Sequence, residues 1–220
     1  MRPQAILFDL YDTLVVTDWP HHAALIADRL GVPVAAVDDA YERLRHLRDG
    51  GRPSDARSVL AAVAEACGVP ADDRQMDELA AMEARFLATE IRFYDDSLEV
   101  LGELRQRGVK TGVVSNCSPS TRPVVDRLGL NESTDVVVLS CEVGVTKPDS
   151  AIFQHALDAI GVAPGASVFV DDRADYLDGA RRLGMGTYRI VRDVSHGETV
   201  IGGDHPVIRH LTELVPLARP

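Results

Sequence analysis

The chain has 220 residues, of which 45% are hydrophobic and 26% charged, as expected for a globular protein with one large domain or a domain with a smaller attachment. Its formal net charge of −11 argues against a nucleic-acid partner, because proteins that bind phosphate backbones carry a basic surface. No apolar stretch reaches the length of a membrane span, and Cys67, Cys117 and Cys141 follow no disulfide or zinc spacing. We therefore expect a cytoplasmic protein, a monomer or homodimer, that binds neither nucleic acid nor a membrane.

Five short apolar runs rich in β-branched residues are predicted to be buried strands: 5–10, 111–115, 136–139, 167–170 and 187–191. Their hydrophobicity is continuous rather than alternating, which is typical of parallel strands covered on both faces. Helical patterns that stop at a glycine separate the later strands, at 97–107, 120–128, 150–160 and 175–183, and a last amphipathic helix is expected over 207–217. This alternation of strand and helix predicts an α/β fold, a Rossmann-like, doubly wound parallel sheet.

Residues 16–94 interrupt this alternation. They contain no convincing strand, only helical stretches at 21–30, 37–48, 54–67 and 74–91. The simplest interpretation is an α/β core domain formed by 1–15 and 95–220, with a helical cap domain, 16–94, inserted after the first strand.

Polar side chains follow the first two predicted strands, at the edge where open α/β sheets place their ligands. Asp9 ends the first strand and a turn follows it, so its carboxylate can be held rigidly as a nucleophile. Taken alone, this segment is better interpreted as an ordinary turn at the end of a strand. Ser115 and Asn116 end the second strand and are suited to hold a phosphoryl or carboxylate oxygen.

The third and fourth strands also end in polar groups. Lys147 is one of only two lysines among 23 basic residues, and its ammonium can offset a carboxylate nucleophile and an anionic substrate. Lys110, the other lysine, is interpreted as a surface residue. Asp171 and Asp172 would repel each other without a cation, which predicts a Mg²⁺ site. Four polar clusters in this order are far more specific than any one of them.

The pattern resembles the haloacid dehalogenase superfamily over nearly the whole chain. Its first motif, DxDxT, is similar to residues 9–13, the second to Ser115, the third to Lys147 and the fourth to the Asp171–Asp172 pair. The inserted helices resemble the C1-type cap of subfamily I. The resemblance implies a mobile lid, an aspartyl-enzyme intermediate and usually Mg²⁺.

The resemblance also implies roles for individual residues. It assigns Asp9 as the nucleophile. The metal site would be formed by Asp9, the backbone carbonyl of Tyr11, Asp171 and Asp172, with Asp172 as the direct ligand. The substrate would be held by Thr13, Ser115, Asn116 and Lys147.

Tyr11 departs from the family pattern. Most phosphatases of the superfamily carry at this position an Asp that acts as the general acid and base. A phenol with an ordinary pKa of about 10 is a poor base near neutral pH. Asp12 is expected to point elsewhere, so we expect Tyr11 to make phosphatase turnover slow.

Three functional interpretations remain open. The first is a Mg²⁺-dependent phosphatase of a small phosphorylated metabolite, in which Asp9 attacks phosphorus while Ser115 and Lys147 hold the phosphoryl oxygens. The second is a 2-haloacid dehalogenase, which Tyr11 favours; it would bind the carboxylate of a halogenated acid with an arginine such as Arg43, Arg45 or Arg48. The third is a weakly active or inactive protein that binds a phosphorylated ligand. The Asp171–Asp172 pair favours the first.

Other residues receive structural interpretations. His21 and His22 are expected to be surface residues, and Trp19 is expected to mark the junction of core and cap. Arg173 is expected to pair with Asp171 or Asp175.

Overall fold

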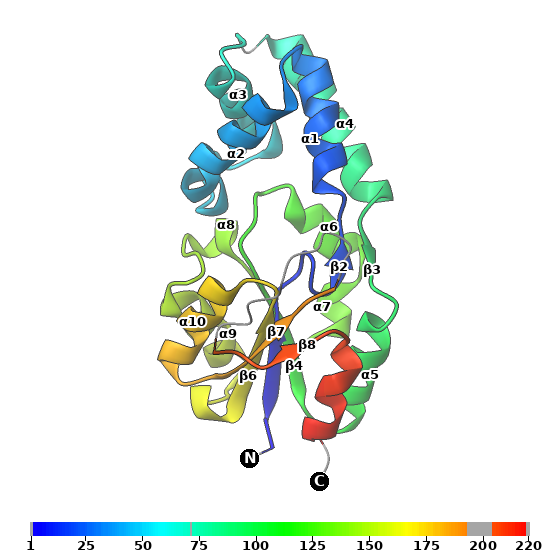
Figure 1. Ribbon diagram of the computed structural model, residues 1–220, viewed down its shortest axis with the longest axis vertical. Coiled ribbons are helices and arrows are strands. Elements are labelled where there is room, and N and C mark those ends of the chain that lie inside the picture. The colour runs from blue at the N-terminus through cyan, green and yellow to red at the C-terminus, as the bar shows by residue number, and fades with distance from the viewer. Residues whose placement is uncertain (1, 71, 193–203, 219–220) are drawn as a thin grey trace.

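The computed structural model describes residues 2–70, 72–192 and 204–218 of the chain. In this part of the chain a six-stranded sheet has the order β5-β4-β1-β6-β7-β8, and all neighbouring strands are parallel (Figure 1). The strands are β1 (Ala5–Phe8), β4 (Lys110–Ser115), β5 (Val136–Leu139), β6 (Ser167–Asp171), β7 (Gly186–Ile190) and β8 (Val207–Ile208). The chain adds strands first on one side of β1 and then on the other, so the predicted doubly wound α/β fold is confirmed.

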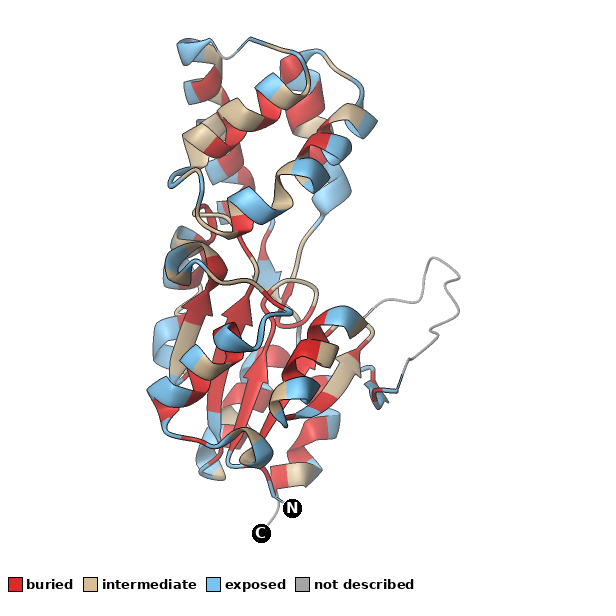
Figure 2. Ribbon diagram, turned by 90° about the vertical axis from the view of Figure 1, so that its left-hand side faces the viewer, coloured by how far each residue is buried: buried red, intermediate tan, exposed pale blue. Residues whose placement is uncertain are grey.

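Helices cover both faces of this sheet, and its strands are largely buried (Figure 2). Successive side chains of β1 point to opposite faces. Ile6 and Phe8 pack in one core with α5 and the C-terminal 3-10 helix η2, whereas Ala5 and Leu7 pack in the other core with α9 and α10. These elements and their shorter neighbours are α5 (Ser97–Gln106), α6 (Thr121–Arg127), α7 (Leu130–Ser133), α8 (Ser140–Val143), α9 (Ser150–Ile160), η1 (Pro164–Ala166), α10 (Ala174–Leu183) and η2 (Leu211–Ala218).

Four helices form a separate bundle above the carboxyl edge of the sheet (Figure 1). They are α1 (Trp19–Leu30), α2 (Val34–Asp49), α3 (Ala56–Ala66) and α4 (Asp73–Thr89). The bundle has its own apolar core, in which Ile26, Leu60 and Leu79 are buried. Among the described helices, none combines the length and the apolarity needed to cross a membrane.

The bundle is connected to the sheet by two segments that pair with each other. β2 (Val15–Val16) and β3 (Arg92–Phe93) form a short antiparallel ladder. The expectation that 16–94 contains no strand is therefore wrong at both ends of this range. Strands of two residues are too short to show the alternation from which strands are predicted.

The C-terminal segment also differs from the expectation. The helix expected over 207–217 is wrong, because Val207 and Ile208 form β8, which pairs with β7. The segment then continues as the 3-10 helix η2, which contains Pro216. Its buried residues, Leu211, Leu214, Val215 and Ala218, have the i, i+3, i+4 spacing that also indicates an α-helix.

Candidate active site

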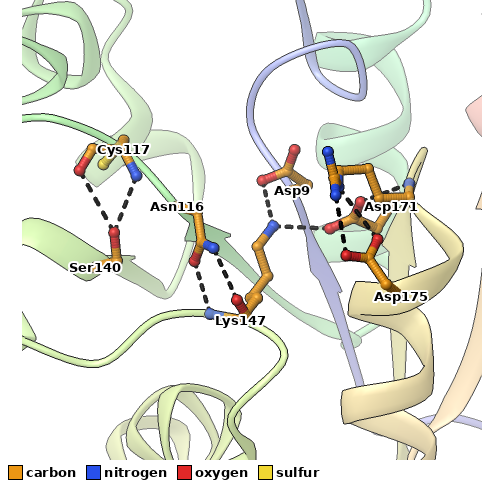
Figure 3. A network of polar contacts seen from close by, with 8 residues as sticks. Asp9, Asn116, Cys117, Ser140, Lys147, Asp171 and Asp175 are labelled. Atoms are coloured by element: carbon orange, nitrogen blue, oxygen red, sulfur yellow. Dashed lines mark hydrogen bonds and ion pairs between the residues drawn. The ribbon is translucent and has the colours of Figure 1, made fainter. Parts of the chain in front are cut away.

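The polar groups that follow β1, β5 and β6 meet at the carboxyl edge of the sheet (Figure 3). Asp9 follows β1, and its backbone N–H donates a hydrogen bond of 2.9 Å to the carbonyl oxygen of Val170. The Nζ atom of Lys147 lies 2.6 Å from Oδ1 of Asp9 and 2.7 Å from Oδ2 of Asp171. One ammonium group therefore joins carboxylates from two adjacent strands.

The Lys147 side chain is completely buried, with 0% of its surface exposed. Its ammonium lies 5.2 Å from the ring centre of Phe169 and 4.8 Å from that of Tyr176. Burial disfavours the charged form, but the charges of Asp171 and Asp9 outweigh it and raise the pKa of Lys147 above its ordinary value. The ammonium therefore remains charged at neutral pH.

Asn116 fixes the backbone that carries Lys147 (Figure 3). Its Nδ2 donates to the carbonyl oxygen of Lys147 at 2.9 Å, and its Oδ1 accepts from the Lys147 N–H at 2.7 Å. Both ends of the side-chain amide are thus used within the protein. Asn116 borders the cavity, and these contacts give it a positioning role toward Lys147.

Three carboxylates gather beside this ammonium. Asp9, Asp171 and Asp172 each place an oxygen within 4.8 Å of the others. Asp171 is fully buried and engages both of its oxygens, one with Lys147 and the other with the N–H of Arg173 at 2.8 Å. Burial and the charge of Asp9 raise the pKa of Asp172. Asp9 and Asp172 are therefore the carboxylates best placed to hold a cation, while Asp171 orients Lys147.

Thr13 and Ser115 lie next to these groups but not on the cavity surface. Their side chains are 0% and 1% exposed, and neither hydroxyl has a hydrogen-bond partner among the described residues. The residues that follow Ser115 border the cavity instead, namely Asn116, Cys117 and Ser118. The structure thus brings both hydroxyl residues to the edge of the site without exposing them to it.

A cavity of about 510 Å³ lies between this edge of the sheet and the helical bundle. From the core it is lined by Asp9, Asp12, Asn116, Lys147 and Asp172 among others, and from the bundle by Trp19, His22, Tyr41, Arg45, Arg48 and Glu83. Glu83 is a further cavity residue that no motif in the sequence indicates. The surface location expected for His22 is wrong, because this residue is only 5% exposed. His22 precedes Ile26 by four residues on the buried face of α1, and this spacing is the signal that could have revealed it.

Tyr11 is held by contacts with both the core and the bundle. Its hydroxyl forms a hydrogen bond of 2.9 Å with Oγ1 of Thr121, and its ring meets the Trp19 ring edge-on at 5.0 Å between centres. Burial raises the pKa of Tyr11 far above its ordinary value. The phenol therefore stays protonated near neutral pH and cannot act as a base.

Asp12 lines the same cavity, so the expectation that it points elsewhere is wrong. Its backbone is in the left-handed region, with φ of 56°, a conformation that Asp adopts more readily than most residues. Burial, with the charges of Asp172 and Asp9, raises the pKa of Asp12 to about 7.

The two arginines of α2 that line the cavity are paired with neighbouring carboxylates. Arg45 pairs with Glu42, and Nε of Arg48 donates to Oδ1 of Asp49 at 2.8 Å. Arg43 donates to a backbone carbonyl within the bundle and does not line the cavity. In the same way Arg173 on the core pairs with Asp175 at 3.0 Å, as expected.

Comparison with known proteins identifies the family. A family model described as haloacid dehalogenase-like hydrolase matches residues 3–184. The chain is 29% identical to "Phosphatase MT3486" of Mycobacterium tuberculosis, over 97% of this chain and 96% of that protein. It is 28% identical to an N-acetylmuramic acid 6-phosphate phosphatase of Pseudomonas aeruginosa, over 98% and 94% of the two chains.

Among solved structures, a 2-haloacid dehalogenase from Pseudomonas syringae superposes with a TM-score of 0.72 at 25% identity, covering 97% of this chain and 96% of that one. Phosphatases and dehalogenases are thus both similar to this chain over nearly its full length. The family model, the parallel sheet and the order of the polar groups along it agree. This protein belongs to the haloacid dehalogenase-like hydrolases.

Proposed function

We propose that this protein is a Mg²⁺-dependent phosphatase that hydrolyses small phosphorylated metabolites through an aspartyl-phosphate at Asp9. The observation that carries the proposal is the balance of charge at the strand ends. The oxygens of three carboxylates, those of Asp9, Asp171 and Asp172, lie within 4.8 Å of one another, and one ammonium, that of Lys147, contacts Asp9 and Asp171. The charge left over is negative and largely buried, which suits a divalent cation.

The chemistry of these ligands fits Mg²⁺, which prefers oxygen ligands and is held by one or two carboxylates together with water and substrate phosphate. Asp9 and Asp172 would hold the ion, with the Tyr11 carbonyl as a further ligand and Asp171 beside them. When bound, the ion would neutralise charge on the phosphoryl group.

The residues of the chain itself support nucleophilic attack by Asp9. Lys147 holds Oδ1 of Asp9, while Oδ2 receives no hydrogen bond from the described residues. In the first step this oxygen forms a bond to phosphorus as the bond to the ester oxygen of the substrate breaks. In the second step water attacks phosphorus, phosphate leaves and the carboxylate of Asp9 is restored.

The cavity suits a small substrate. Its volume of about 510 Å³ lies within the usual range of sites for small molecules. We propose that Lys147 binds the phosphoryl oxygens of the substrate. Ser115, Thr13 and Asn116 would support the phosphoryl end of the site. The bundle of α1–α4 would act as the cap over the core, with 16–94 as cap and 1–15 and 95–220 as core.

Dehalogenation of a 2-haloacid is the second candidate, favoured by Tyr11 and by the similarity to solved dehalogenases. That reaction requires a cation for the carboxylate of the substrate. Arg45 and Arg48 line the cavity but are paired with Glu42 and Asp49. The acidic cluster would also repel an anionic haloacid in the absence of a metal.

The decisive experiment measures phosphate release from p-nitrophenyl phosphate and from a panel of phosphorylated metabolites. Wild-type protein and Asp9→Asn are each assayed with Mg²⁺ and with EDTA. We expect release that requires Mg²⁺ and disappears in Asp9→Asn. If no phosphate is released, the proposal is wrong for these substrates. Halide release from 2-chloropropionate would then indicate the dehalogenase, and its absence would indicate a protein that only binds its ligand.

A further inference from the structure

Two buried titratable residues of the bundle face each other at the cavity. His22 lies on α1 and Glu83 on α4, each is 5% exposed, and both line the cavity that contains Asp9. The Nε2 atom of His22 lies 3.5 Å from Oε1 of Glu83. The second carboxylate oxygen of Glu83 accepts a hydrogen bond of 3.0 Å from Oγ of Ser120, at the start of α6 in the core. Glu83 is therefore held by a hydrogen bond from the core and lies beside His22 of the bundle.

This pair lies next to Tyr11, the residue that replaces the usual acid. The Trp19 ring stands between them, 5.0 Å from the ring centre of Tyr11 and 5.8 Å from that of His22. On the other side, the Tyr11 hydroxyl contacts Thr121, whose neighbour Ser120 contacts Glu83. Two independent sets of contacts thus lead from the position of the missing acid to the His22–Glu83 pair.

His22 is not committed to another polar partner. Its Nε2 is buried and makes no hydrogen bond with any described residue. The other groups around its ring are the aromatic side chains of Trp19, Tyr41 and Phe86. Glu83 is the carboxylate beside it, at 3.5 Å, and a carboxylate next to a histidine orients the ring.

We propose that His22 is the general acid and base of this enzyme, supplied by the bundle in place of the family's aspartate, and that Glu83 is its positioning residue. The inference rests on the proposed phosphatase function. As the bond between phosphorus and the ester oxygen breaks, the imidazolium gives the proton on Nδ1 to that oxygen, because Nε2 is buried beside Glu83, and an alcohol leaves. As water then attacks the aspartyl-phosphate, the neutral imidazole takes up the proton of the water. His22 thereby returns to its starting form, and phosphate and the Asp9 carboxylate are released.

Leaving groups of different basicity test this proposal. p-Nitrophenolate leaves readily without a proton, whereas the phenol released from phenyl phosphate has a pKa of about 10, like tyrosine, and needs one. The two substrates differ by one nitro group. The measured quantity is kcat/KM for each substrate, compared among wild type, His22→Gln, Glu83→Gln and the control His21→Gln. His21 is the neighbouring histidine on α1, and it is exposed.

We expect His22→Gln to lower kcat/KM for phenyl phosphate by about 100-fold. For p-nitrophenyl phosphate we expect a loss in kcat/KM of about tenfold or less. Glu83→Gln should change the ratio of kcat/KM between the two substrates in the same direction by a smaller factor. His21→Gln should leave this ratio unchanged. Equal losses on both substrates in the His22 and Glu83 variants would show a merely structural role and overturn the proposal. An unchanged rate on phenyl phosphate would overturn it as well.

Two further measurements keep this result separate from other failures. Thermal unfolding of each variant shows whether it folds. If His22→Gln does not fold, the ratio of kcat/KM for the two substrates in Glu83→Gln tests the proposal instead. If even wild type releases no phosphate that depends on Asp9, the proposed function fails. If wild type is active and the substrate ratio is the same in all variants, only the role of His22 fails.

Discussion

The side-chain amide of Asn116 closes two hydrogen bonds with the backbone of Lys147, accepting at 2.7 Å and donating at 2.9 Å. These bonds hold in place the residue that binds Asp9. We predict that Asn116→Ala lowers kcat/KM by roughly 10- to 100-fold, because small displacements of a catalytic group are costly. It should also lower the free energy of unfolding by about 1–3 kcal/mol. Enzyme assays and urea unfolding measure the two effects, with Asn131→Ala, an exposed residue of α7, as control. Unchanged activity would contradict this role.

Lys147 is also predicted to be essential for stability. Lys147→Met leaves the carboxylates of Asp9 and Asp171 buried without their ammonium partner. We expect a loss of about 3–5 kcal/mol in the free energy of unfolding at pH 7 in EDTA, and no phosphatase activity. Lys110→Met is the matched control, because the Lys110 ammonium contacts the backbone carbonyl of Ile160, at the end of α9, and no carboxylate of the site. Similar stabilities for the two variants would refute the prediction.

The acidic cluster predicts stabilisation by Mg²⁺. A ligand that binds only the folded state at 100 times its Kd stabilises it by about 2.7 kcal/mol. We expect Mg²⁺ to raise the melting temperature of the wild type and to have no such effect on Asp172→Asn. Asp175→Asn is the control, because Asp175 pairs with Arg173 outside the cluster. The same shift in wild type and Asp172→Asn would mean that Mg²⁺ binds elsewhere.

Asp12 predicts a specific dependence of stability on pH in the metal-free protein. Its pKa rises from 3.8 to about 7 on folding. Between these values the unfolded chain releases this proton while the folded protein keeps it, so the wild type loses stability as pH rises from about 4 to about 7. Solvent screening of this partly exposed side chain keeps the total below about 4 kcal/mol.

Asp12→Asn removes this loss. In EDTA, the variant should therefore gain stability relative to wild type between pH 4 and pH 7, and the difference should stay constant above that range. Urea unfolding at a series of pH values measures it. A difference between the two proteins that does not change with pH would show that Asp12 titrates normally.

Local patterns in the sequence were sufficient for the sheet and for most of its helices. The strand runs are apolar because both faces are covered, and glycines such as Gly161 end helices in the left-handed conformation. The same patterns failed at 207–217. There, Val207 and Ile208 form a strand because they pair with β7. The sequence of so short a segment does not predict which strand it pairs with.

The sequence by itself determined which groups stand at the ends of the strands. Parallel strands bring their carboxyl ends to one edge, so Asp9, Lys147 and Asp171 were expected at the same edge of the sheet. The strand order, which places β1 beside β6, decided that Lys147 contacts both carboxylates. Only the tertiary structure decided what faces them. The docking of the bundle on the sheet places the buried residues His22 and Glu83 at the cavity that Asp12 and Tyr11 line from the core. These contacts join residues far apart in the chain and depend on how the bundle packs against the sheet. The hydrophobic periodicity within each unit does not predict that packing.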